Sequence, residues 1–247
     1  MNQDISICVL SENEMGWTEP FELDEVQILD TYYLAAQKSD IAFLKKMDTA
    51  RLLVGFRTTA GIDTKGVRPY GGWEDSLLGG HCLTAIAQAV KATGDEELKE
   101  KSQVLIEGLE ECQRKLGTGF LFGAKVEDKE DVEKQFDILE RKKKGETWVP
   151  WYNMHKVLAG LIDTYKYTEN ETALLIAEKL GDWIYERVSK WDLKTNQKVL
   201  ETEYGGMNDC LYELYSYSHN KHHLEAAQKF DEKALFLMAA KGEKNCL

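Results

Sequence analysis

The sequence predicts an all-α fold made of repeated helical hairpins, and two features of the chain support this. Apolar residues recur at i, i+3, i+4 and i+7 over residues 83–90 and 158–165, and most of the pattern returns over residues 211–215. That spacing places the apolar side chains on one face of a helix. Each stretch ends at a short polar break, after which a helical pattern resumes. Strand-like alternation is scarce, so little β-structure is expected.

The three stretches form a repeat. Asp95, Asn170 and Asn220 occupy the breaks, and shifts of 75 and 50 residues bring them into register. All three residue types cap helices, because a side-chain oxygen accepts a hydrogen bond from an unpaired N–H of the first turn. We therefore expect each unit to be a helix, a tight polar turn and an antiparallel helix. In the same register two sets of apolar positions coincide: Ile86 with Leu161 and Leu211, and Leu105 with Leu180 and Phe230.

Upstream, residues 24–56 are expected to form a related unit, with a first helix through Leu34 and a second helix carrying the apolar residues from Phe43 to Leu53. Gly61 is expected to end that second helix. Residues 1–23 are predicted to be an irregular N-terminal arm, within a single helical-hairpin domain that spans residues 1–247. Stacked hairpins either extend as an open solenoid or curve into a closed toroid, and the repeat does not decide between them.

Composition excludes several classes of function. The chain has 31 basic and 43 acidic residues, a net charge of −12, so nucleic acid and anionic membranes are unfavourable partners. Its apolar stretches fall short of the roughly 20 residues of a membrane span, and the first ten residues do not resemble a secretory signal. The five cysteines are scattered without a CxxC pair, which favours reduced thiols in a cytoplasmic protein.

Three patches between the hairpins combine glycine, aromatic and polar residues, at residues 70–81, 148–156 and 203–209. Each patch leads into the first turns of a helix, at matching positions of the repeat. We therefore expect all three patches at the same end of the bundle. Aromatic rings can stack on the apolar faces of a neutral sugar, while carboxylate, amide and imidazole groups bind its hydroxyls. A phosphate is disfavoured because no P-loop Lys-Ser/Thr pair follows the glycines. The candidate binding residues are Trp73, Glu74, His81, Trp151, Tyr152, His155 and Glu203.

Structural roles stay open for several of these residues. In a structural role, His81 and His155 would be hydrogen-bonded imidazoles that contact no ligand. Glu203 would interact with the positive end of the dipole of the helix that follows it. The histidines within residues 219–223 are expected to be solvated at a hairpin turn. A metal role would need a further ligand beside these histidines, and none is evident, so we predict no metal site in this chain.

At the same patches the sequence resembles glycoside hydrolase family 127, the β-L-arabinofuranosidase type. Pro-Trp-Tyr-x-x-His-Lys at residues 150–156 and Glu-x-Gly-Gly-Met-Asn at residues 203–208 are similar to motifs of the family's N-terminal catalytic region. Tyr-Gly-Gly-Trp-Glu at residues 70–74 and Gly-His-Cys-Leu-Thr-Ala at residues 80–85 resemble that region as well. The similarity extends over about residues 26–238.

The resemblance implies an α/α toroid of six hairpins whose loops at one end hold the sugar, with His81 and His155 lining the pocket. It also implies that the complete enzyme uses a zinc-bound cysteine thiolate as nucleophile and a glutamate as general acid/base, both after a His-Ala-Asn-Thr motif. That motif and an adjacent cysteine pair are missing from this sequence, which stops at Leu247. We therefore expect an incomplete toroid of about four hairpins, with no zinc of its own and unknown catalytic residues.

An incomplete ring leaves apolar helix faces in water, so we expect another copy of the chain or a missing C-terminal part to cover the open edge. Whether the chain alone is an enzyme stays undecided. Two alternatives remain besides a portion of a glycoside hydrolase. One is a different sugar enzyme on a toroidal scaffold, such as an unsaturated uronyl hydrolase or a sugar epimerase, and the other is a non-catalytic helical-repeat interaction module.

Overall fold

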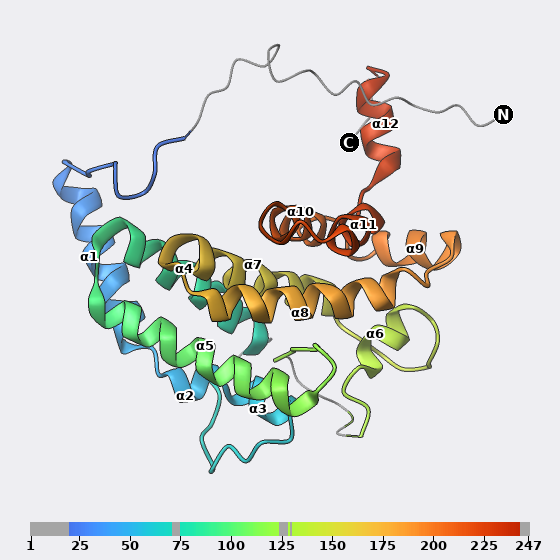
Figure 1. Cartoon of the computed structure of the whole chain (residues 1–247), viewed down its shortest axis with the longest axis horizontal. Helices are drawn as coiled ribbons and strands as arrows, with labels where there is room; N and C mark the ends of the chain where they lie inside the picture. The colour runs from blue at the N-terminus through green and yellow to red at the C-terminus, as the bar shows by residue number, and fades with distance from the viewer. Residues whose placement is uncertain (1–19, 71–74, 124–127, 129, 243–247) are drawn as a thin grey trace.

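The computed structural model of the chain describes residues 20–70, 75–123, 128 and 130–242, and these form helices joined by loops, without a β-strand (Figure 1). The all-α prediction is therefore confirmed. In chain order the helices are α1 (Thr31–Lys46), α2 (Thr49–Leu52), α3 (Val54–Thr59), α4 (Asp75–Thr93), α5 (Glu96–Leu116), α6 (Lys134–Leu139), α7 (Pro150–Thr168), α8 (Glu171–Val188), α9 (Leu193–Leu200), α10 (Met207–Ser218), α11 (Lys221–Lys229) and α12 (Lys233–Ala240).

Three helical hairpins, α4–α5, α7–α8 and α10–α11, are the body of the fold. Their second helices begin at the predicted caps: Asp95 accepts a hydrogen bond from the N–H of Leu98, and Asn170 from that of Ala173. Asn220 accepts one from the N–H of His222. The repeat and its polar turns are thus confirmed.

The hairpins stack in two layers. In one layer α7 packs between α4 and α10, and in the other α8 packs between α5 and α11 (Figure 1). The aligned apolar positions of the repeat all lie in the core between the layers, each at most 3% exposed. Burying such side chains against one another is the main favourable contribution to folding. The chain therefore forms a two-layered stack of helical hairpins, the arrangement expected for part of an α/α toroid.

The first helices of two successive hairpins, α4 and α7, approach each other unusually closely. A Cβ atom added to Gly80 of α4 would lie 2.4 Å from the carbonyl carbon of Lys156 in α7. One added to Gly160 of α7 would lie 2.7 Å from the carbonyl oxygen of Gly80 and from Cβ of Leu83. Glycine at both positions therefore permits a contact between backbones, which no larger residue would allow.

The N-terminal unit differs from the prediction. A single helix, α1, covers the region in which a first helix through Leu34 was expected to end. The chain from Leu34 to Lys46 has no glycine or proline to stop it, and α1 instead begins after Asp30, whose carboxylate accepts from the N–H groups of Tyr32 and Tyr33. Phe43 and Leu44, expected in the second helix, belong to α1, and two short helices, α2 and α3, follow it. Gly61 comes after α3 with φ of +65°. Of the predicted irregular arm, residues 20–23 are described and are not helical.

The expectation that the histidines of residues 219–223 are all solvated is wrong for His223. Its side chain is fully buried, and Nδ1 lies 2.8 Å from the hydroxyl of Ser218. The ring packs against Gly181 of α8, where a Cβ atom would lie 2.8 Å from Nε2. His223 therefore contributes to the contact between α11 and α8.

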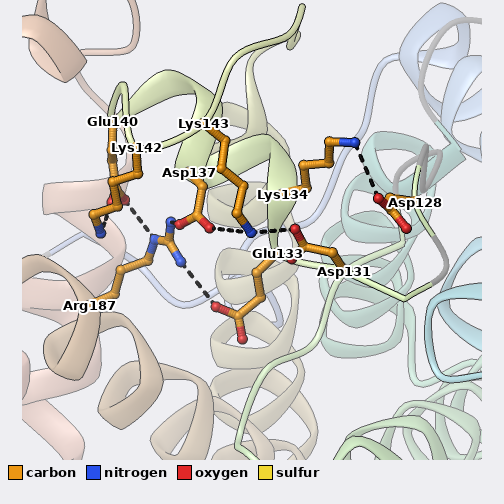
Figure 2. Close-up of polar contacts among 9 residues, drawn as sticks. All are labelled: Asp128, Asp131, Glu133, Lys134, Asp137, Glu140, Lys142, Lys143 and Arg187. Carbon is orange, nitrogen blue, oxygen red and sulfur yellow. Dashed lines mark hydrogen bonds and ion pairs between the residues drawn. The ribbon is translucent and has the colours of Figure 1, made fainter.

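The connector between α5 and α7 is fastened to α8 by an ion-pair network around Arg187 (Figure 2). Its guanidinium donates to Glu140 at 2.6 Å, to Asp137 at 2.5 Å and to Glu133 at 3.0 Å. Lys143 extends the network by contacting Asp137 at 3.0 Å. Burial raises the pKa of Asp137, but hydrogen bonds from Lys143 and Arg187 outweigh this and leave it below its usual value.

None of the described helices is both long enough and apolar enough to cross a membrane.

Replacing Gly80 with alanine should destabilise the fold by about 2 kcal/mol or more, because the added methyl group meets the backbone of α7, which cannot rotate away. Urea unfolding followed by circular dichroism would measure the change. Gln88→Ala, on an exposed position of the same helix, is the matched control and should stay within about 0.5 kcal/mol of the wild type. Equal stabilities of both variants would contradict the close contact.

Replacing Arg187 with methionine should cost about 3 kcal/mol or more, because the buried Glu140 carboxylate would lose its main partner. Lys198→Ala removes an exposed ion pair with Glu201 and should cost less than about 1 kcal/mol. Urea midpoints of the two variants give the comparison. A loss below about 1 kcal/mol for Arg187→Met would show that the network does not fasten the connector.

Candidate functional site

The N-terminal ends of α7 and α10 meet, and the beginning of α4 joins them. Gly80, one residue before His81, lies against the backbone of Lys156. Gly206, one residue before α10, lies against the ring of His155. The described parts of the three predicted patches therefore lie at the same end of the bundle.

His155 is at the centre of this region. Its side chain is 6% exposed and lies between the ring of Tyr152, at a centroid distance of 5.1 Å, and the backbone of Gly206. A Cβ atom at Gly206 would lie 2.7 Å from Nε2 of His155, and Gly206 also has φ of +75°. Only glycine suits both conditions. The backbone carbonyl of His155 in turn accepts from the thiol of Cys210 at 3.5 Å.

The environment keeps both histidines neutral. Burial, followed by the positive charge of Lys156, lowers the pKa of His155 from 6.5 to about 4. Partial burial and the same lysine lower the pKa of His81. A neutral imidazole has one donor and one acceptor nitrogen, so each ring can both give and take a hydrogen bond with a hydroxyl group.

Tyr152 presents the open aromatic face of the site. Its side chain is 44% exposed, and the ammonium of Lys156 lies 5.2 Å from the centre of its ring. This arrangement leaves an apolar ring, a cation and an imidazole on adjacent turns of α7. Such a surface can stack on one face of a small polar ligand and bind its edge.

Glu203 occupies a different position from the one expected. Its side chain is 6% exposed, and Oε2 accepts a hydrogen bond from the backbone N–H of Tyr152 at 2.8 Å. The structure therefore places this carboxylate at the beginning of α7, although the sequence suggested the helix that follows Glu203. The contact joins residues 51 apart in sequence, and no local pattern indicates it.

Trp151 points away from the candidate site and into the core. It is 1% exposed, and its nearest aromatic neighbours are Phe136 at 4.8 Å and Phe230 at 5.1 Å between ring centroids. This burial argues against the predicted contact between Trp151 and a sugar. Trp73 and Glu74 lie outside the described residues, so their predicted roles stay predictions.

Arg51 holds the loop that leads to the 70–81 patch, a role that the sequence did not reveal. Its guanidinium lies 3.8 Å from the ring centre of Tyr70 and donates to the carbonyls of Arg68 and Pro69, each at 3.1 Å. His81 itself is exposed and faces an open groove of about 710 Å³ between α1 and α4. The groove is mostly apolar, with Tyr33, Phe43 and Ala85 among its lining residues.

The model of the GH127 catalytic domain, described as β-L-arabinofuranosidase, matches residues 25–246. The chain belongs to this family. No curated protein sequence matches this GH127 chain.

Solved structures of the family share the fold. A GH127 β-L-arabinofuranosidase from Geobacillus stearothermophilus T6 superposes with a TM-score of 0.58 at 15% identity, over 89% of this chain and 35% of that one. A second GH127 β-arabinofuranosidase gives a TM-score of 0.55 at 15% identity, over 85% of this chain and 33% of that one. This GH127 chain thus spans about a third of the length of these relatives.

The described residues of this GH127 chain do not fit a zinc site. No three histidine, cysteine, aspartate or glutamate side chains of the described ranges come together closely enough to hold a metal ion. The three described cysteines are free and buried, and burial raises the pKa of Cys82 to about 11 and those of Cys112 and Cys210 to about 12. Their thiolate forms are therefore scarce at neutral pH, and we derive no step through zinc.

The titration of His155 tests the electrostatics of this site. We expect NMR to show half-protonation near pH 4 in the wild type and at a higher pH in Lys156→Met, because the variant lacks the neighbouring positive charge. Lys221→Met, on the exposed first residue of α11, should leave the titration unchanged. A wild-type pKa near 6.5 would contradict the buried neutral ring.

The same shift has a consequence for stability. The pKa of His155 in the folded chain lies below its unfolded value of 6.5. The contribution of His155 to the free energy of unfolding is therefore fully present above pH 6.5 and is lost as the pH falls towards 4.

Proposed function

We propose that this chain supplies the sugar-binding part of a GH127 glycoside hydrolase site that acts on a neutral β-L-arabinofuranoside. The observation that carries the proposal is the convergence of His81, Tyr152, His155 and Lys156 at the helix ends of a GH127 domain. The name of the related enzyme from Geobacillus stearothermophilus T6 supports the choice of glycoside.

The chemistry of the site suits an uncharged ring. The exposed face of Tyr152 can stack on the C–H face of a furanose. Neutral His81 and His155 can exchange donor and acceptor roles with hydroxyl groups, whereas a protonated imidazole only donates. This preference for hydroxyls, together with the scarcity of arginine in the three patches, favours a neutral glycoside over the acidic sugar of a uronyl hydrolase.

We further propose that the nucleophile and the general acid/base come from outside the described residues, with zinc as a cofactor of the complete GH127 site. The high pKa values of Cys82, Cys112 and Cys210 support this, because a thiol nucleophile acts as thiolate. Cys8 and Cys246 lie outside the described residues. The three buried free thiols also suit a reducing compartment, so we propose a cytoplasmic location.

A role in assembly is the second candidate. Near the groove of α1, Leu29, Tyr32 and Phe43 are 80%, 76% and 60% exposed. Exposed apolar residues gathered on one edge are typical of surfaces that another polypeptide covers. Another copy of this chain or a further part of a GH127 domain would suit that edge.

Calorimetric titration with an aryl β-L-arabinofuranoside tests the proposed function. We expect the wild-type chain to bind the glycoside, and His155→Ala to weaken binding at least about tenfold, a loss of about 1.4 kcal/mol. Lys221→Ala, at the far end of the hairpins, should bind like the wild type. Release of the aryl group should stay close to the uncatalysed rate with or without zinc. Rapid zinc-independent turnover, or equal affinities of His155→Ala and wild type, would contradict the proposal.

A further inference from the structure

We infer that Glu203 is a positioning residue of the candidate site: its carboxylate caps α7 from the neighbouring connector and so fixes the helical turn that presents Tyr152 and His155. The inference rests on the proposed function of the same site. It assigns Glu203 a role behind the binding surface in place of the predicted contact with ligand.

Helix α7 lacks a cap of its own. Its N-cap residue is Val149, which has no polar side chain, and its first residue is Pro150. By contrast, α5, α8 and α11 are capped by local Asp or Asn side chains. The N–H of Tyr152, the third residue of α7, is one of the first-turn donors that have no partner within the helix. Glu203 supplies that partner at 2.8 Å.

The segment that carries Glu203 is tied to α9, and together with the following helix α10 it contacts α7 at two further points, both at His155. The N–H of Glu203 donates to the carbonyl of Val199 at 2.8 Å, which ties the segment to the end of α9. Gly206 supports the ring of His155, and Cys210 donates to the carbonyl of the same histidine. The connector therefore fixes both the backbone at Tyr152 and the imidazole one turn later.

Hydrogen bonding and charge agree with a role behind the surface. Glu203 and His155 are both 6% exposed, so burial alone does not separate their roles, but Oε2 of Glu203 is occupied by the backbone N–H of Tyr152, whose side chain faces outward at 44% exposure. A carboxylate at the N-terminal end of a helix is also stabilised by the helix dipole, and a charged acceptor makes a stronger bond than a neutral one. Glutamine at this position would keep an acceptor oxygen but lose the charge.

The test compares Glu203→Gln and Glu203→Ala with a matched control, Glu201→Ala, which removes an exposed carboxylate two residues earlier. Hydrogen exchange of the Tyr152 amide, measured by NMR, should be faster by about fivefold or more in Glu203→Ala, and less so in Glu203→Gln. The pKa of His155 should rise towards 6.5, more in Glu203→Ala than in Glu203→Gln, because a loosened turn exposes the ring to water. Affinity for the aryl β-L-arabinofuranoside should fall in that order too, and Glu201→Ala should match the wild type in all three measurements.

Two results would overturn the inference. One is unchanged exchange of the Tyr152 amide in Glu203→Gln and Glu203→Ala. The other is a complete loss of glycoside binding in Glu203→Gln with the amide still protected, which would mean that the carboxylate contacts the ligand. If Glu203→Ala does not fold, Glu203→Gln alone carries the comparison. Amide exchange and the titration of His155 are measured without sugar. If both change in the expected order but the wild-type chain does not bind the glycoside, the cap is supported and only the proposed function is rejected.

Discussion

The structure depends on the contact between the backbones of α4 and α7. With Gly80 and Gly160 facing the opposite helix, the two helices approach without intervening side chains. That proximity brings the residues that follow Gly80, including His81, next to the first turns of α7. Larger residues would separate the helices and spread the polar groups over different parts of the surface. The site is thus a consequence of how closely two helices pack.

Much of the fold could be predicted from local features of the sequence. Asp95, Asn170 and Asn220 act within one turn of their own helices, and the apolar positions aligned with Ile86 repeat at helical spacing. The N-terminal unit was predicted wrongly because its sequence has a clear helix start but no helix stop. Asp30 starts a helix and nothing in the next 16 residues stops it, so the pattern alone did not locate the break at Asp48.

The candidate site was less predictable because its geometry depends on distant residues. Trp151 and Tyr152 are adjacent in one motif, yet successive helical residues point about 100° apart, which places one in the core and the other at the surface. The bond from Tyr152 to Glu203 crosses 51 positions, and the low pKa of His155 depends on burial between segments. Composition and spacing indicate which residues gather but not which of them faces the ligand.

The two ends of the hairpins differ in their tolerance of change. The far ends are short turns closed by their own caps, such as Gly94-Asp95 and Glu169-Asn170, while the site end carries the long connectors. Helix α7 has 19 residues, so it separates the two ends by about 28 Å. A fluorophore or an inserted peptide at the Gly94-Asp95 or Glu169-Asn170 turn would therefore be well clear of His81 and His155, which makes these turns suitable attachment points for reporters of ligand binding.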